Sequence, residues 1–214
     1  EETELEKTKR LANEGNAEAQ NKLGLMYREG EGVPKDDKEA LKLFKLSADQ
    51  GYVNAKYNLA WMYRTGGQGV PRDYKKAVKL YELLAGQGEA NAQYSLGLMY
   101  ERGQGVQQDY KEAVRLYRMS ADQGYAVAQN TLGFMYQKGR GVPQDSKEMI
   151  KWLRMSADQG NAVGQAYLAQ IYTRGWGVPK DYKQGYIWLS IAKMNGKRNV
   201  STNHLETKMT KEQI

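Results

Sequence analysis

Five glycine-rich segments recur along the chain, and glycine pairs of this kind can hold a phosphate group. They have the form Gly-x-Gly-Val and begin at Gly30, Gly67, Gly103, Gly139 and Gly175. A dinucleotide-binding loop follows a β-strand, opens a helix and carries a third glycine. Each of these segments lacks the third glycine and follows a helical pattern. We therefore interpret them as helix terminators, and we expect no nucleotide or other cofactor.

A recurring aspartate could supply carboxylates for acid–base or metal chemistry. Its five occurrences are Asp36, Asp73, Asp109, Asp145 and Asp181. Each lies a whole period from the next and precedes a helical pattern, where a carboxylate caps free N–H groups. The single histidine, His204, has no second metal ligand and no framed serine, and the chain has no cysteine. The sequence therefore predicts no catalytic residue and no metal site, and we expect that the protein is not an enzyme.

A line of basic residues suggests nucleic-acid binding as another chemical possibility. The line comprises Arg28, Arg64, Arg102, Lys138 and Arg174. Acidic residues interrupt it, and across the chain 25 acidic residues are mixed among 32 basic ones, giving a net charge of +7. A nucleic-acid-binding protein more often clusters its lysines and arginines in one patch. Binding of nucleic acid or another acidic ligand is kept as an alternative, but the distribution disfavours it.

The elements that position these residues form a repeat. A glycine returns at intervals of 36, 37, 36, 36 and 36 residues, at Gly15, Gly51, Gly88, Gly124, Gly160 and Gly196. The extra residue comes from the doubled Gly66-Gly67. Within each period a Leu-Gly/Ala-x-x-Tyr string precedes the glycine-rich segment. Such self-similarity predicts one array in which each unit needs its neighbours, because no unit buries its apolar face alone.

Each period predicts two helices. The first, over residues 17–29, places Ala19, Leu23 and Met26 on one face. The second opens at the recurring aspartate, and a glutamate three residues later completes a capping-box pattern in three repeats, as Asp36/Glu39, Asp109/Glu112 and Asp145/Glu148. Glycine in the middle of the first helix, as at Gly24, costs about 1 kcal/mol relative to alanine. We expect that it admits close approach of the paired second helix.

The expected domain organisation is five repeats with a partial element at each end. The repeats span residues 16–51, 52–88, 89–124, 125–160 and 161–196. Residues 1–14 align with the second helix of a preceding, truncated repeat, and residues 197–214 are expected to form a capping helix that is also cut short. No segment has the roughly 20 consecutive apolar residues of a membrane span. A signal peptide, if the protein has one, would lie upstream of Glu1, and we expect a monomer.

The segment from Gly88 to Ala113 carries the pattern G-x-A-x-A-Q-x-x-L-G-x-M-Y-x-x-G-x-G-V-x-x-D-Y-x-x-A almost whole. This pattern resembles the Sel1-like repeat family, which is related to the tetratricopeptide repeats. The resemblance implies an all-α fold, a right-handed α-solenoid of helix–turn–helix repeats whose first helices line the concave side. It also implies a non-catalytic scaffold or adaptor that binds a protein or peptide.

The same resemblance also has implications for the cellular location of the protein and for an alternative, enzymatic function. Many members are bacterial and are exported to the envelope or to a host, so we expect a secreted, periplasmic or envelope-associated protein. A cysteine-rich branch has been linked to β-lactamase activity, which makes a hydrolase of that kind an alternative function. This chain departs from that branch because it has no cysteine.

Five positions of the first helix vary between repeats, whereas its framework positions hardly change. Aligning Leu23-Gly24 with the tetratricopeptide arrangement places the variable positions on the concave face. The residues predicted to contact a partner in this groove are Asn21, Leu25, Arg28, Asn54, Tyr57, Trp61, Arg64, Tyr94, Leu98, Glu101, Asn130, Phe134 and Gln137.

Tryptophan, tyrosine and arginine are enriched at binding hot spots, and Tyr57, Trp61 and Arg64 share one helical stripe. The alternative for Trp61 and Phe134 is packing against the neighbouring repeat alone. Trp176 replaces a polar residue in the last glycine-rich segment. It is either a second contact site or a residue that packs on the C-terminal helix.

Overall fold

The computed structural model describes residues 2–196, and this part of the chain folds into eleven α-helices, with no strand beyond one isolated bridge between Gly67 and Val70. The helices are α1 Glu4–Asn13, α2 Ala17–Glu29, α3 Asp37–Asp49, α4 Val53–Thr65, α5 Tyr74–Gly86, α6 Ala90–Arg102, α7 Tyr110–Asp122, α8 Ala126–Lys138, α9 Ser146–Asp158, α10 Ala162–Arg174 and α11 Tyr182–Met194. The expected capping helix over 197–214, with His204, lies outside the described residues.

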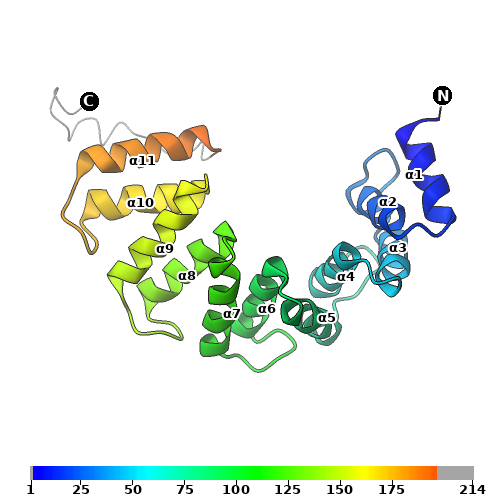
Figure 1. The fold of residues 1–214 in the computed structure, drawn as a ribbon, viewed down its shortest axis with the longest axis horizontal. Helices are drawn as coiled ribbons and strands as arrows, with labels where there is room; N and C mark the ends of the chain where they lie inside the picture. The colour runs from blue at the N-terminus through cyan, green and yellow to red at the C-terminus, as the bar shows by residue number, and fades with distance from the viewer. Residues whose placement is uncertain (1, 197–214) are drawn as a thin grey trace. The chain divides into compact units, whose positions relative to one another are not determined.

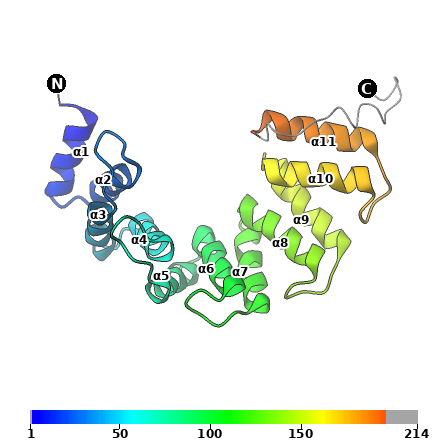
Figure 2. The same cartoon turned by 180° about the vertical axis from the view of Figure 1, so that it is seen from behind.

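The helices fall into two units, one ending at Gln108 with α1 to α6 and one beginning at Asp109 with α7 to α11. Within each unit every helix packs on the next along the chain, and neighbouring helices lie side by side in both views (Figure 1 and Figure 2). Helices that can bury an apolar face only against their neighbours produce this serial packing. The fold class expected from the sequence, an all-α solenoid of helix–turn–helix repeats, is confirmed.

The helix ends follow the glycine and aspartate positions of the repeat. Gly30, Gly103, Gly139 and Gly175 each follow a first helix with left-handed backbone, with φ between 63° and 77°. All five recurring aspartates cap the second helices, as predicted. The Asp36 carboxylate, for example, accepts hydrogen bonds from the backbone N–H groups of Lys38 and Glu39, both at 3.0 Å.

The second half of the predicted capping box is not formed on these helices. The glutamate side chain does not return to the cap; it pairs with a cation three residues further along the exposed helix face. The pairs are Glu39–Lys42, Glu112–Arg115 and Glu148–Lys151, with N···O distances of 3.1, 2.6 and 3.2 Å. Neighbours at this spacing attract one another on a helix surface, and here the cation competes with the cap for the carboxylate.

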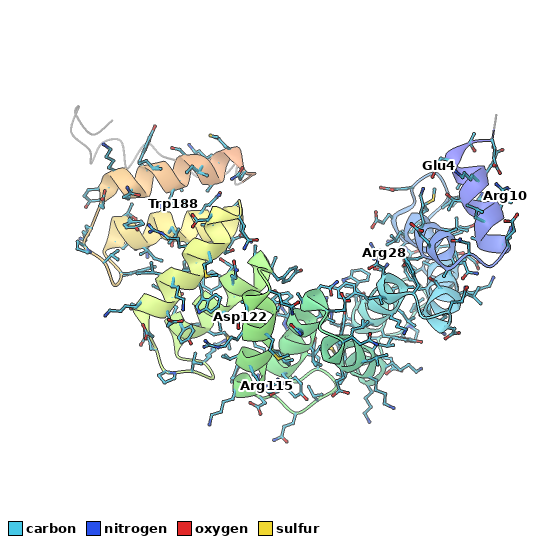
Figure 3. The ribbon with its side chains drawn as sticks, in the orientation of Figure 1. Glu4, Arg10, Arg28, Arg115, Asp122 and Trp188 are labelled. Carbon is cyan, nitrogen blue, oxygen red and sulfur yellow. The ribbon has the colours of Figure 1, made fainter. Side chains whose placement is uncertain are left out.

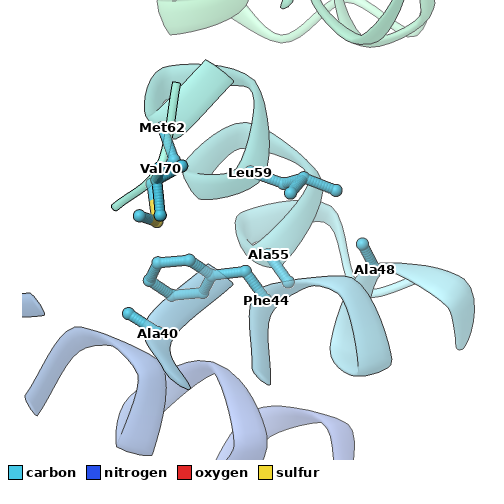
Figure 4. Close-up of a cluster of buried hydrophobic side chains, with 7 residues drawn as sticks. All are labelled: Ala40, Phe44, Ala48, Ala55, Leu59, Met62 and Val70. Atoms are coloured by element: carbon cyan, nitrogen blue, oxygen red, sulfur yellow. The ribbon is translucent and has the colours of Figure 1, made fainter. Parts of the chain in front are cut away.

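Phe44 is the centre of the core between α3 and α4 (Figure 4). It is fully buried together with Ala40 and Ala55, and it packs among Leu59 and Met62. A Cβ placed on Gly24 would lie 2.7 Å from the Phe44 ring. The mid-helix glycine of α2 is therefore required by the close approach of the paired helix, as the sequence predicted.

A buried glutamine joins successive helices in four of the repeats. Its side-chain amide donates to a carbonyl near the end of the preceding second helix, and the pairs are Gln20–Ala12, Gln93–Ala85, Gln129–Ala121 and Gln165–Ala157, at 3.0 to 3.3 Å. In three of them the amide oxygen also accepts from a side chain 30 residues later, as Gln129 does from Gln159 at 2.7 Å. Each such amide ties three consecutive helices together.

The one-residue insertion at Gly66-Gly67 is matched by a substitution 30 residues earlier. The glycine-rich loops of later repeats pack on Tyr74, Tyr110 or Ser146, whereas this loop packs on Asp37. The Asp37 carboxylate is buried and accepts a hydrogen bond from the Gln68 backbone N–H at 2.7 Å. A Cβ on Gly67 would lie 2.6 Å from a carboxylate oxygen of Asp37. The insertion is therefore absorbed locally.

Candidate partner-binding surface

The residues predicted from α2, α4 and α6 all belong to the first unit. We use the name first-helix surface for Leu25, Arg28, Tyr57, Trp61, Arg64, Tyr94, Leu98 and Glu101, each of which is partly exposed. Asn54, at the start of α4, is exposed. Positions i, i+4 and i+7 of one helix share a face, so α4 presents Tyr57, Trp61 and Arg64 together.

Trp61 is held from two sides and still reaches solvent. The Arg28 guanidinium lies 4.7 Å from the centre of the Trp61 ring, and Arg28, on α2 (Figure 3), also pairs with Glu29 at 2.5 Å. Beneath, Trp61 and Leu25 pack against the cluster around Phe44. Trp61 therefore does pack against the neighbouring repeat, which was the alternative considered for it, but this packing leaves the Trp61 ring partly exposed.

Tyr57 connects this surface to the interior. Its hydroxyl lies 3.2 Å from the Ser95 hydroxyl on α6, and its ring meets the Tyr81 ring edge-on, with centroids 5.7 Å apart. Tyr81, on α5, is fully buried, and its hydroxyl has no hydrogen-bond partner among the described residues. Burial raises the pKa of Tyr81 to about 12, the nearby Tyr57 adds to the rise, and the positive charge of Arg64 opposes it.

Two asparagines predicted to contact a partner are buried instead, and these predictions were wrong. Asn21 and Asn130 are each 7% exposed. Asn21 accepts a hydrogen bond from the Asn58 side chain at 2.8 Å, which joins α2 to α4. Their position in the first helix turns toward the next first helix: Asn21 bonds Asn58 there and Tyr57 bonds Ser95, and only the larger Tyr57 stays partly exposed.

In the second unit, Phe134 packs edge-on against Tyr167 of the next first helix, with ring centroids 4.3 Å apart. Phe134 is partly exposed, so packing accounts for a portion of its surface. Gln137 lines a cavity of about 330 Å³ together with Trp176, Met149 and the glycines of the last glycine-rich loop. The Arg174 guanidinium lies 4.8 Å from the Trp176 ring. The other expectation for Trp176, packing on a C-terminal helix, involves residues 197–214, which lie outside the described part of the chain.

Comparison with known proteins identifies the repeat. Five consecutive matches to the Sel1 repeat cover residues 17–52, 53–89, 90–125, 126–161 and 162–197. The chain belongs to the Sel1 repeat family. No curated protein sequence matches it.

Solved structures of Sel1 repeat proteins resemble the chain closely. A protective antigen of uropathogenic Escherichia coli with an SLR fold is 34% identical over 96% of the chain, with a TM-score of 0.82; the chain spans only 44% of that antigen. A Sel1 repeat protein of Oxalobacter formigenes is 29% identical over 92% of the chain and 87% of its own, with a TM-score of 0.75. An immunity protein of Pseudomonas aeruginosa, 20% identical over 94% of the chain and 76% of its own, shares the fold with a TM-score of 0.58.

Sequence reasoning missed two features of these Sel1 repeats. The repeat pattern places Tyr81 in the core position that holds Phe44 one repeat earlier, but it did not predict the burial of the Tyr81 hydroxyl, for which a tyrosine in a phenylalanine position was the available signal. One exposed apolar position also recurs on the second helices. Its members are Leu46 and Leu83 in the first unit and Met119 and Met155 in the second, between 38% and 47% exposed.

The chemical candidates considered from the sequence have structural roles where the structure describes them. The five aspartates cap helices, and two cations of the basic line, Arg28 and Arg174, stack on tryptophans. Among residues 2–196, no three histidine, cysteine, aspartate or glutamate side chains gather as a metal site would require. None of the helices in this range is long and apolar enough to cross a bilayer.

Proposed function

We propose that this Sel1 repeat protein is a non-catalytic scaffold that holds a partner protein or peptide on the first-helix surface of its first three repeats. One observation carries the proposal: Tyr57, Trp61 and Arg64 share one partly exposed face of α4, and α6, which Tyr57 contacts at Ser95, carries the half-buried Tyr94 and Leu98. Aromatic and arginine side chains bury much area while keeping a polar group available, so such clusters dominate binding energies. Membership of the Sel1 repeat family supports the same conclusion.

The test is capture of a binding partner by the purified wild-type protein, compared with capture by a variant altered on the first-helix surface. We expect that Trp61→Ala combined with Arg64→Ala abolishes capture, because it removes the largest ring and the adjacent cation of the surface. Trp61 also packs on the core cluster, so Arg64→Ala alone is included. It leaves that packing in place and should weaken capture with helicity unchanged by circular dichroism.

The second repeat also offers a matched control. Leu83→Ala with Lys79→Gln removes an exposed apolar side chain and a cation from α5, on the second helix of the same repeat. Undiminished capture by this control and loss in the α4 variant support the first-helix surface. Loss only in the control would assign binding to the second helices and overturn the proposal.

We further propose that the scaffold acts at the envelope or outside a bacterial cell. The support is the 34% identity to a protective antigen of uropathogenic Escherichia coli. Antibody labelling of the native protein on intact and on lysed cells distinguishes the possibilities. Labelling, or extraction with the periplasmic fraction, before lysis supports the proposal, whereas recovery only after full lysis contradicts it.

A further inference from the structure

The two arginines of the first-helix surface differ in what surrounds their charge, and this difference bears on the chemistry of the partner. Arg28 is neutralised within the chain, because its guanidinium pairs with the Glu29 carboxylate and stacks on Trp61. Arg64 forms no ion pair with any residue of the described range, and its Nε atom is buried without a hydrogen-bond acceptor. One cation of the surface therefore lacks a counter-ion.

A buried phenol lies behind the same surface. Tyr81 is fully buried, and its ring meets the Tyr57 ring of α4 with centroids 5.7 Å apart, so its hydroxyl is not open to a partner. Tyr57 and Ser95, whose hydroxyls lie 3.2 Å apart, complete a polar floor built from α4, α5 and α6.

Unpaired buried donors are rare because each one loses its hydration without compensation. A partly exposed guanidinium that forms no ion pair with any described residue indicates a position suited to an oxygen-rich, negatively charged group. Guanidinium matches a carboxylate best, since two N–H groups can donate to its two oxygens in one plane. The indole of Trp61, one helical turn away on the same stripe, offers an apolar contact beside that charge.

This inference rests on the proposed function. We propose that the first-helix surface binds its partner through a carboxylate, from an acidic side chain or from a chain terminus, which the Arg64 guanidinium holds while an adjacent apolar or aromatic side chain packs on Trp61. The partner is accordingly an extended acidic segment with an apolar residue next to the acid. Charge-assisted pairing of this kind fixes the register of the bound segment as well as adding affinity.

The test uses two synthetic random peptide libraries, one with amidated C-termini and one with free C-terminal carboxylates, screened against the whole chain. We expect the selected peptides to carry Asp or Glu beside an apolar residue. Selection from the amidated library indicates an acidic side chain, and selection only from the free-carboxylate library indicates a chain terminus. Arg64→Gln should weaken the binding of the selected peptides about tenfold or more. Peptides in which the selected carboxylate is replaced by its amide should bind the wild-type protein and Arg64→Gln equally.

Two further variants separate failure of this inference from failure of the proposed function. Lys79→Gln removes one exposed cation from α5 and should leave peptide affinity unchanged. If peptides bind and lose binding in Trp61→Ala, but carry neither an acidic side chain nor a required free C-terminus, or bind Arg64→Gln equally well, the carboxylate inference is wrong and the surface assignment stands. If no peptide binds, or binding is indifferent to both Trp61→Ala and Arg64→Gln, the assignment of the surface fails as well. Circular dichroism of each variant confirms that it is folded.

Discussion

Replacing Tyr81 by phenylalanine isolates the energetic effect of one buried hydroxyl. The ring keeps its place, since Phe44 occupies the same position one repeat earlier and is equally buried. The hydroxyl has no hydrogen-bond partner among the described residues, and an unsatisfied buried polar group costs free energy. At neutral pH we therefore expect Tyr81→Phe to leave the free energy of unfolding unchanged or to raise it by up to about 1 kcal/mol.

The difference in the free energy of unfolding between the wild-type protein and Tyr81→Phe should grow in alkaline solution. Burial raises the pKa of Tyr81 from 10.0 to about 12. Between these two values the unfolded chain releases the phenol proton and the folded chain retains it. The unfolded state then binds fewer protons, so the free energy of unfolding falls as the pH rises. At 1.36 kcal/mol per pKa unit, the wild-type protein should lose about 2 kcal/mol by about pH 11.5 that Tyr81→Phe does not lose.

Urea unfolding followed by circular dichroism at about pH 8 and about pH 11.5 measures this difference. The other ionisations affect both proteins equally and cancel in the comparison. Tyr52→Phe, which alters a partly exposed ring at the start of α4, is the control and should follow the wild type. Parallel loss of stability in wild type and Tyr81→Phe would show that water reaches the Tyr81 hydroxyl, and would refute the burial argument.

Three other substitutions test the packing of the repeats, each by urea unfolding. Gln129→Leu removes an amide that makes two hydrogen bonds between helices, at 3.1 and 2.7 Å, so stability should fall by about 1–3 kcal/mol; no loss would mean that the amide does not tie the helices. Gly67→Ala should lower stability by about 1–3 kcal/mol, because the added methyl group collides with Asp37. The loss should be clearly smaller when Asp37→Ser is also present. If the losses of the two substitutions simply add, the contact between Gly67 and Asp37 is contradicted. Asn21→Ala removes the hydrogen bond to Asn58 and should lower stability by about 1–2 kcal/mol, while partner capture is retained. Weaker capture by the folded variant would show that Asn21 belongs to the binding surface.

The features that could be predicted from sequence depend on local chemistry. Capping by Asp36 and termination at Gly30 follow from groups within a few residues. The aspartate cap recurs in all five repeats and the left-handed glycine end in four. The need for glycine at position 24 also followed, because a glycine in a helix has an energetic cost that only close packing explains. The serial arrangement of the helices then followed from their apolar faces.

The features that could not be predicted depend on a few degrees of rotation about a helix axis. Asn21 and Tyr57 hold the same position in successive repeats, and the pattern treats them alike. Asn21 is short enough to be covered at the contact with the next first helix, whereas Tyr57, although it bonds Ser95 there, is large enough to stay partly exposed. Likewise the pattern marks position 81 as core, but whether the phenol of Tyr81 finds a hydrogen-bond partner depends on the placement of Arg64, which can only donate, and of Ser95.

The hydrogen bonds between repeats described here join residues no more than 38 positions apart. A stretch of one full period, inserted or removed at a repeat boundary, would find the same donors and acceptors in its new neighbours. A chain of this kind can therefore change length in whole repeats while its existing contacts are reproduced. A single residue inserted within a helix would offset the register of that helix, whereas the extra residue at Gly66-Gly67 lies in a loop, where the Asp37 carboxylate accepts a hydrogen bond from the Gln68 backbone N–H. Length is thus the property this architecture alters most readily, in steps of one period.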